Sequence, residues 1–247
     1  ETGFLDGDKL AIEADGSFEV IISEQQHSGN WLPVSKDSES LLIRQTYRHR
    51  ELEEPAEITI ERLNTDAVPA PLELMTAIAH FEKAIAFYRN TTRMFADWSQ
   101  KISEQPNTLP LWDQAFCQRV GGDPNILYYH GHFKLQTDEA MVITLPEIPK
   151  CQTWNIQVDN YWMESLDYRY HRVSLNQAQA EVSHTGSVTI VLSGVNPGCN
   201  NWISTAGHRE GTLCFRWVGA EGCVDPQVVV TPLNKVLNDE HLGLSRT

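Results

Sequence analysis

The chain has 247 residues, of which 41% are hydrophobic and 21% are charged, and its formal net charge is −14. A negative field of this size repels nucleic-acid phosphates and anionic membrane surfaces, so the composition excludes both kinds of partner. No apolar run approaches the roughly 18–20 residues that a transmembrane helix needs, which predicts a soluble protein.

Two parts of the chain follow the same order of residues at an offset of 170–172. The matched stretches are DGSFEVIIS at 15–23 with TGSVTIVLS at 185–193, GNWL at 29–32 with NNWI at 200–203, LLIR at 41–44 with LCFR at 213–216, and ITIERL at 58–63 with VVVTPL at 228–233. Short β-branched runs bounded by Gly, Pro, Asn and Ser are typical of all-β sandwiches. We therefore predict two copies of one module, each with three strands.

Each copy carries an Asn-Trp pair, Asn30-Trp31 in the first and Asn201-Trp202 in the second. We interpret the pair as a corner in which the Asn side chain bonds to loop backbone and the Trp fills the gap between two sheets.

Residues 72–100 have a helical period instead. Leu74, Ile78, Phe81 and Ile85 recur at steps of three and four residues, which predicts an amphipathic helix. A loop rich in Pro and Gly follows as far as Pro124. The β pattern then returns, and we predict strands at 127–135, 140–145 and 153–162.

The predicted fold is mainly β: a jelly-roll-like β-sandwich built from two repeated β modules with an interposed amphipathic helix. Residues 1–70 form the first β module, 71–125 the helical and loop connection, 126–237 the second β module, and 238–247 a tail. The chain begins at Glu1 without an initiator Met, which we interpret as a fragment or processed product. The first module is therefore expected to be truncated on its N-terminal side.

The five cysteines match no CxxC pair or zinc-binding pattern, and their odd number leaves at least one thiol unpaired. This usage favours a reducing compartment, and with it a cytoplasmic location.

A long motif, WNIQVDNYWMESLDYR at 154–169, runs into VSLN at 173–176, NPG at 196–198, NW at 201–202 and TAGHREG at 205–211. Together these stretches resemble the domain-of-unknown-function 1214 family, which also occurs fused to the domain of unknown function 1254. GNWLP at 29–33 is similar to the family's upstream signature. The resemblance covers nearly the whole chain and implies a jelly-roll-like β architecture in a C-terminal portion of a member. It implies no reaction.

His130 and His132 are candidate metal ligands. They point to one face of a predicted strand, because side chains alternate along a strand. Two imidazoles can supply two positions of a cupin-like metal centre, completed by His171, His208 or Glu210. The alternative is a pair of half-exposed histidines beside Lys134, whose ammonium group disfavours a cation. No other cofactor is predicted.

The strand that begins at Trp154 offers a second candidate. Its alternation directs Asn155, Gln157, Asp159 and Tyr161 away from the apolar side chains. Amides, a carboxylate and a phenol on a concave sheet suit a polar small molecule. A solvated outer face is the alternative. The ligand-binding candidates are Gln157, Asn160, Asp167, Tyr168 and Arg169. Asp167 and Arg169 are also explained by a local ion pair.

The loop after the second Asn-Trp pair is the candidate catalytic site. Gly207 and Gly211 bracket His208, Arg209 and Glu210, so a tight loop can present a base, a cation and an acid. His208 or Glu210 can move protons, and Arg209 can hold a carboxylate or a developing oxyanion. The alternative is that Arg209 and Glu210 pair locally and only fix the loop.

The leading functional hypothesis is a polar small-molecule site between Gln157 and this loop, hydrolase- or lyase-like if the protein is an enzyme. A non-catalytic ligand-binding or assembly module and a cupin-like metalloprotein are the alternatives. The expected partners are a polar small molecule and the N-terminal part of the same protein, with a homo-oligomer left open. The sequence does not decide whether the protein is an enzyme.

Overall fold

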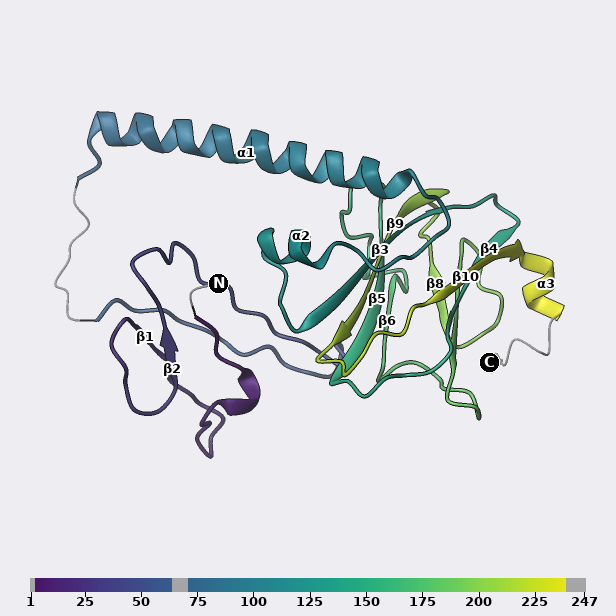
Figure 1. The fold of residues 1–247 in the computed structure, drawn as a ribbon, viewed down its shortest axis with the longest axis horizontal. Coiled ribbons are helices and arrows are strands. Elements are labelled where there is room, and N and C mark those ends of the chain that lie inside the picture. The colour runs from purple at the N-terminus through teal and green to yellow at the C-terminus, as the bar shows by residue number, and fades with distance from the viewer. Residues whose placement is uncertain (1–2, 64–70, 239–247) are drawn as a thin grey trace. The chain divides into compact units, whose positions relative to one another are not determined.

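The structure is a computed structural model that describes residues 3–63 and 71–238. It divides into two compact units, Glu1–Tyr47 and Arg48–Thr247 (Figure 1). Of the predicted tail at 238–247, only Asn238 lies within the described residues.

The first unit is small and has little regular structure. A 3-10 helix, η1 (Gly7–Lys9), precedes two short strands, β1 (Ile21–Ser23) and β2 (Trp31–Pro33), which pair in parallel. Asp6 caps η1 by accepting a hydrogen bond from the backbone N–H of Asp8. None of the described residues 3–47 is buried, so this part of the unit has no core of its own.

The second unit contains two four-stranded sheets arranged as a sandwich. One sheet has the order β10-β4-β7-β8 and the other the order β3-β9-β5-β6. The strands are β3 (Ile126–Lys134), β4 (Glu139–Leu145), β5 (Thr153–Asp159), β6 (Ser174–Asn176), β7 (Val188–Ser193), β8 (Trp202–Ser204), β9 (Glu210–Val218) and β10 (Gln227–Pro232). The mainly β, sandwich-like prediction is confirmed, and the sheets do not close into a barrel.

The main core is a cluster of apolar side chains from both sheets. Trp154, Phe215 and Trp217 are fully buried in it, as are Met141 and Ile190 from the other sheet. The ring centroids of Phe215 and Trp217 lie 4.8 Å apart in an edge-to-face arrangement. Burial of aromatic and β-branched residues on one face of each sheet is the main stabilising contribution of a sandwich.

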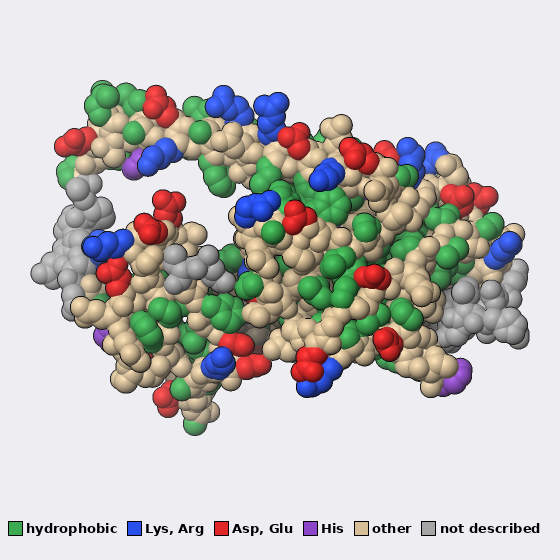
Figure 2. Space-filling model, in the orientation of Figure 1, with side chains coloured by type: hydrophobic (Ala, Val, Ile, Leu, Met, Phe, Trp, Pro, Cys, Tyr) green, Lys and Arg blue, Asp and Glu red, His purple; other side chains and the backbone are tan. Residues whose placement is uncertain are grey.

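The predicted helix is present as α1 (Leu74–Ser103), but its apolar stripe is exposed along most of its length. Ile78, Phe81 and Ile85 have 41%, 70% and 63% of their surface exposed, and only Trp98, Ser99 and Ile102 at the C-terminal end are buried. Figure 2 shows hydrophobic side chains at the surface of this helix. Within the described residues, no helix combines the length and apolarity needed to cross a membrane.

Two short helices were not predicted. α2 (Gln114–Arg119) begins after Asp113, whose side chain accepts a hydrogen bond from the backbone N–H of Phe116. It packs with the end of α1, where the rings of Trp98 and Phe116 lie 4.9 Å apart. α3 (Leu233–Asn238) follows β10 directly, and Val236 packs in a small cluster with Val142 and Val191.

The two Asn-Trp pairs make matching hydrogen bonds. The Trp31 indole donates to the backbone O and Oγ of Ser23, and the Trp202 indole donates to the same two atoms of Ser193. The backbone N–H of Ile21 donates to the carbonyl of Asn30, as that of Val191 does to Asn201. Each Asn side chain also exchanges two hydrogen bonds with one backbone, Asn30 with Ala11 and Asn201 with Glu181. The expected bonding of Asn to loop backbone is therefore present in both units.

Contrary to the expectation from sequence, the Trp of the second corner does not fill the gap between the sheets. Trp202 is half-buried and packs against the small cluster that contains Ala140, Val191 and Cys199, apart from the main core. The side chains of β7 that alternate with Val191, such as Ile190 and Leu192, fill the core instead.

The predicted strands at 41–44 and 58–63 are absent. Both segments are irregular, and Leu42 and Ile60 expose 65% and 74% of their surface. Their sequence counterparts become strands in the second unit, because β9 lies between β3 and β5 and β10 pairs with β4. A strand needs such a neighbour to satisfy its backbone N–H and C=O groups.

Replacing Trp202 by Phe should lower the free energy of unfolding by about 1–2 kcal/mol, because the variant loses the indole hydrogen bonds to Ser193 and some buried volume. Urea unfolding monitored by far-UV circular dichroism measures the effect. Trp162→Phe is the matched control, since Trp162 is 54% exposed. Equal losses in both variants would contradict a structural role for the corner.

Candidate functional site

The sheet β3-β9-β5-β6 turns a polar face away from the main core. Strand β5 places Ile156 and Val158 in the core and Asn155, Gln157 and Asp159 on the opposite face, as the period-two pattern predicted. Asp159 is only 4% exposed. This face is thus partly covered, and the alternative of a fully solvated outer face is wrong for Asp159.

Strand register aligns polar side chains of three strands on this face. One row contains His130, Cys214 and Gln157, and the next contains His132, Thr212 and Asp159. Most of these side chains are buried although they lie outside the main core. A buried polar layer of this kind is costly unless its groups are hydrogen-bonded.

Asp159 and Arg216 are linked through an amide. Gln157 Nε2 donates to the two carboxylate oxygens of Asp159 at 2.9 and 3.1 Å. Arg216 Nη1 donates to Gln157 Oε1 and to Asn155 Oδ1, each at 3.1 Å. Burial nevertheless dominates, and it raises the pKa of the Asp159 carboxyl from its usual value to about 6, against the opposing effects of Gln157 and Arg216.

His130 lies under an aromatic cover. Its ring is 4.8 Å from that of Trp98 on α1, 5.9 Å from that of Trp112, and parallel to that of Tyr128. Burial, with a smaller contribution from the Arg216 charge, lowers the pKa of His130 to about 3, so the imidazole is neutral. Its Nδ1 atom is buried without a hydrogen-bond partner.

His132 connects the polar layer to the surface. Its Nε2 atom lies 3.8 Å from Glu210 Oε2, and its ring is 5.7 Å from that of Tyr161. Burial lowers the pKa of His132, although the neighbouring Glu210 carboxylate acts in the opposite direction. Glu210 also lies 3.5 Å from Lys134 Nζ. The carboxylate therefore sits between a buried neutral imidazole and an exposed ammonium group.

The loop that carries the candidate catalytic residues turns sharply after β8. Ala206 and Gly207 have φ angles of 48° and 84°, and the backbone N–H of His208 donates to the carbonyl of Thr205. At Gly211 a Cβ atom would lie 2.4 Å from the Asp159 carbonyl oxygen. Glycine there lets β9 pass close to the end of β5.

A turn after β5 forms the other wall. Asn160 Oδ1 accepts hydrogen bonds from the backbone N–H groups of Trp162 and Glu164, and its Nδ2 donates to Glu164 Oε2. Met163 adopts a positive φ of 65° in this turn. Asx-type bonding of this kind orders a turn and fixes its neighbours, here the rings of Tyr161 and Trp162, which lie 4.8 Å apart.

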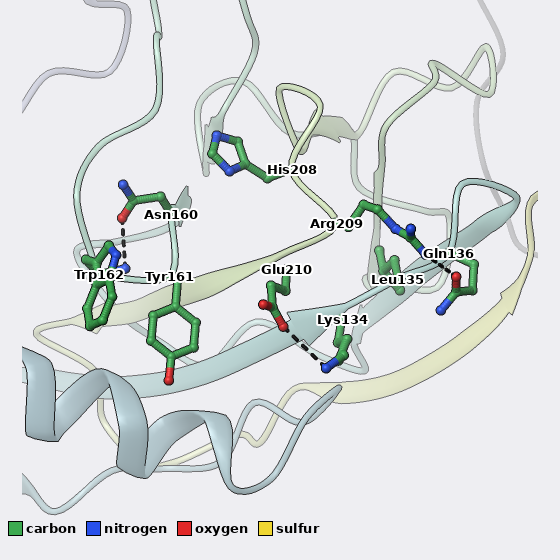
Figure 3. A pocket seen from close by; sticks show the side chains of 9 residues that line it. All are labelled: Lys134, Leu135, Gln136, Asn160, Tyr161, Trp162, His208, Arg209 and Glu210. Atoms are coloured by element: carbon green, nitrogen blue, oxygen red, sulfur yellow. Dashed lines mark hydrogen bonds and ion pairs between the residues drawn. The ribbon is translucent and has the colours of Figure 1, made fainter.

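Between this turn and the loop is a pocket of about 570 Å³ (Figure 3). It is lined by Lys134, Leu135, Gln136, Asn160, Tyr161, Trp162, His208, Arg209 and Glu210. Figure 3 shows Glu210 directed toward Lys134 and Arg209 directed toward Gln136, whose Oε1 accepts a hydrogen bond from the guanidinium. The local Arg209–Glu210 ion pair considered from the sequence is not formed.

The structure brings some predicted site residues together. His208, Arg209 and Glu210 line the pocket with Asn160. Gln157 belongs to the polar layer beneath it, joined to Asp159, which lies in one strand row with His132.

Three ligand-binding candidates lie elsewhere. Asp167 and Arg169 form an exposed ion pair at 3.0 Å, and neither lines the pocket. Tyr168 is 56% exposed, with the guanidinium of Arg50 4.8 Å from its ring centre. The sequence motif that contains them extends past the end of β5, so the chain leaves the sheet before reaching them.

His130 and His132 share a face of β3, as predicted, but no third ligand joins them. Among the described residues, no three His, Cys, Asp or Glu side chains are grouped so that they could hold a metal ion. His130 is enclosed by aromatic rings and His132 by Tyr161 and Glu210. These surroundings do not fit the cupin-like centre.

Sequence reasoning missed several residues of the site. Tyr161 is not among them, because the period-two pattern placed it on the polar face with Gln157 and Asp159, and it lines the pocket. Lys134 is the last residue of β3 and Gln136 follows that strand, and antiparallel pairing with β9 places Lys134 beside Glu210. Nothing in the local sequence indicates that Trp98, on a helix far back in the chain, covers His130.

Among solved structures, the chain is similar to an uncharacterised protein from Burkholderia cenocepacia, with a TM-score of 0.89 and 45% sequence identity over 94% of this chain. The match covers 65% of the Burkholderia chain, so the present chain spans less than two thirds of its length. The VPA0106 protein from Vibrio parahaemolyticus matches with a TM-score of 0.35 and 16% identity, over 47% of this chain and 34% of that one. No curated protein gives a significant match.

The family model described as "Protein of unknown function (DUF1214)" matches residues 3–50 and 130–221. The matched ranges contain both Asn-Trp corners and every residue that lines the pocket. The chain belongs to the DUF1214 family.

Proposed function

We propose that the pocket between β9 and the turn after β5 binds a small polyhydroxylated molecule that carries a carboxylate, that is, a sugar acid. The observation that carries this proposal is the position of Arg209. Its guanidinium bonds to the side-chain amide of Gln136, and no carboxylate of the described residues forms an ion pair with it. A guanidinium in a pocket wall is suited to bidentate recognition of a carboxylate.

The opposite wall suits a sugar ring. Trp162 is 54% exposed and lines the pocket, so its indole offers apolar surface for stacking. The amides of Asn160 and Gln136 supply donors and acceptors for hydroxyl groups. The volume of about 570 Å³ lies within the range of small-molecule sites, roughly 300–1,000 Å³.

The remaining charges of the pocket favour an anionic ligand. Lys134 and Glu210 lie 3.5 Å apart and largely neutralise each other. Arg209 therefore supplies the net positive charge at a site on a protein whose formal net charge is −14. Local attraction of this kind does not need a basic protein surface.

Catalysis of a hydrolase or lyase type is the second candidate, and Glu210 favours it. Its carboxylate is 46% exposed toward the pocket and lies 3.8 Å from the neutral His132 imidazole. A carboxylate with an adjacent imidazole can accept and pass on a proton. Binding without turnover remains the alternative.

Glucuronate and glucose are suitable probes, because they differ in charge at one carbon. Titration followed by protein NMR should show glucuronate binding at least tenfold more tightly than glucose. Arg209→Gln should reduce glucuronate binding to the level of glucose, since a charge-assisted pair contributes about 1.5–3 kcal/mol. Arg169→Gln is the matched control, because Arg169 lies outside the pocket and pairs with Asp167.

Unchanged glucuronate binding in the Arg209→Gln variant, or equal binding of the two probes, would show that the pocket does not recognise a carboxylate. Methyl glucuronide added to the same samples reports hydrolysis through the signals of free glucuronate and methanol, and loss of water from glucuronate itself reports a lyase. Turnover that Glu210→Gln abolishes while binding persists would assign a catalytic role to Glu210.

A further inference from the structure

The two corners correspond in more than their sequence. Turns also match: the backbone N–H of Gly16 donates to the carbonyl of Glu13, and that of Gly186 to Ser183, with φ angles of 87° and 86° at the two glycines. Within each corner, the two short strands pair in parallel, β1 with β2 and β7 with β8. The correspondence therefore includes turn, strand pairing and side-chain bonding.

Past the corner the two parts of the chain differ. In the second unit, Leu213 and Phe215 of β9 are fully buried because β3 and β5 flank that strand. Their counterparts by sequence offset are Leu41 and Ile43, which are 41% and 50% exposed in irregular chain. A run of Leu-Leu-Ile has high β propensity and a large apolar surface, so it is costly to leave in water.

The segment after Pro55 repeats this difference. Val228 and Val230 of β10 pack against the main core, and β10 pairs antiparallel with β4. The counterparts Ile58 and Ile60 are 43% and 74% exposed and form no strand. Both segments thus have strand-like sequences whose counterparts are paired, yet the described residues supply no partner strands for them.

We propose that residues 41–43 and 58–60 are docking edges for further β-strands that lie outside these 247 residues, ahead of residue 1 in a longer polypeptide. The incoming strands would add an antiparallel neighbour to each segment. They would carry alternating apolar residues, as β3, β4 and β5 do, because each must bury one face.

Two observations favour strands from a preceding segment of a longer polypeptide. In the second unit, β3, β4 and β5, which pair with β9 and β10, all precede the corner in the chain, so the counterpart strands are expected ahead of the first corner. The Burkholderia cenocepacia relative, 45% identical, is also longer, since this chain matches 65% of it. A relative of that kind has the additional chain that such strands require.

The exposed apolar stripe of α1 also fits packing against additional chain. Ile78, Phe81 and Ile85 lie on one side of the helix and are all exposed. Such an apolar stripe normally packs against other chain, because an isolated helix gains little stability from its backbone alone.

Hydrogen exchange measured by mass spectrometry tests the proposal on two proteins, the 247-residue chain and the full-length Burkholderia relative. In the 247-residue chain, amides of 41–43 and 58–60 should exchange within seconds, while amides of 213–215 in β9 stay protected. In the full-length relative, the positions aligned with 41–43 and 58–60 should exchange at least 100-fold more slowly.

Fast exchange at those aligned positions in the full-length relative would overturn the proposal, because the extra chain would then leave both segments uncovered. Slow exchange of 41–43 and 58–60 in the isolated 247-residue chain, together with a dimer mass by light scattering, would also overturn the proposal. The two segments would then pair with a second copy of the chain. A chimera that joins the additional Burkholderia chain ahead of residue 1 provides a check in this sequence. Ile43→Asp should reverse the protection of 41–43 in that chimera and leave 213–215 protected.

Discussion

Replacing His130 by Phe should remove an acid-sensitive part of the protein's stability. Burial lowers the pKa of the folded-state imidazole to about 3, whereas the unfolded chain has a histidine of ordinary pKa, about 6.5. Below pH 6.5 this histidine binds a proton in the unfolded state but not in the folded state. The stability contributed by the buried neutral imidazole is therefore complete above pH 6.5 and is lost as the pH falls toward 3.

The expected size follows from the width of that window. Each pH unit within it costs about 1.4 kcal/mol for one group. Between pH 6.5 and 4.5 the wild-type protein should lose roughly 2–3 kcal/mol more than the His130→Phe variant. The phenyl ring also fits the surroundings of Trp98 and Tyr128 and removes the unpartnered Nδ1 atom.

Urea unfolding at pH 7 and pH 4.5 measures the difference. His184→Phe is the control, because His184 is exposed and should leave the pH dependence unchanged. If His130→Phe loses as much stability as the wild type between the two pH values, the imidazole does not stay neutral in the folded protein, and the interpretation of the covered polar layer fails.

Local patterns allowed much of the second unit to be predicted. The alternation of Ile156 and Val158 with Gln157 and Asp159 placed the core and the polar face of β5 correctly, because strand geometry depends only on neighbours in sequence. The helical period found α1 to within a few residues. Pairing partners were not predictable in this way, since nothing in the sequence of Leu41 or Ile43 reports whether a flanking strand exists.

The pocket was predicted in part for a similar reason. Glycines around the loop indicated a tight turn, and His208, Arg209 and Glu210 do line one pocket. Their directions depend on β9 beginning at Glu210, which turns Glu210 toward Lys134 and leaves Arg209 beside Gln136. Asp167 and Arg169 follow Gln157 closely in sequence, yet the turn after β5 carries them away from the pocket. Proximity in sequence is informative within a strand and fails across a turn.

The polar layer and the pocket are electrostatically connected, because His132 of the layer lies beside Glu210 of the pocket lining. It lies in a strand row with Thr212 and Asp159, and its Nε2 atom approaches Glu210 at the pocket. A change of charge in the polar layer is therefore expected to alter the electrostatic environment of Glu210 in the pocket. Among the groups of that layer, Asp159 is expected to affect the free energy of unfolding most at neutral pH, because it ionises there while it is buried.

Replacing Asp159 by Asn should stabilise the protein at neutral and alkaline pH. The folded-state pKa of Asp159 is raised to about 6, above its usual value, so the folded protein retains a proton that the unfolded chain releases. The stability due to the protonated carboxyl is complete below pH 4 and is lost as the pH rises through 6. Asparagine has the shape of the carboxyl group and never ionises.

The gain should increase with pH. For a pKa raised to about 6, the penalty for ionising Asp159 reaches about 3 kcal/mol at pH 8 and about half of that at pH 5. The introduced amide must also rearrange the hydrogen bonding with Gln157, which donates to both carboxylate oxygens in the wild type, at a cost of about 1 kcal/mol. Asp159→Asn should therefore raise the free energy of unfolding by about 1–2 kcal/mol at pH 8 and by less at pH 5.

Urea titrations at pH 5 and pH 8 test this, with the exposed Asp138→Asn as the control for a change in net charge. A gain that is the same at both pH values would come from net charge or packing and would not reflect ionisation of Asp159. A loss at pH 8 would mean that Arg216, although it bonds to Gln157 and Asn155, stabilises the Asp159 carboxylate more than burial destabilises it. The sign of the effect at pH 8 thus decides between two cases. Either burial destabilises the ionised Asp159 carboxylate overall, or Arg216 offsets the full free-energy cost of its burial.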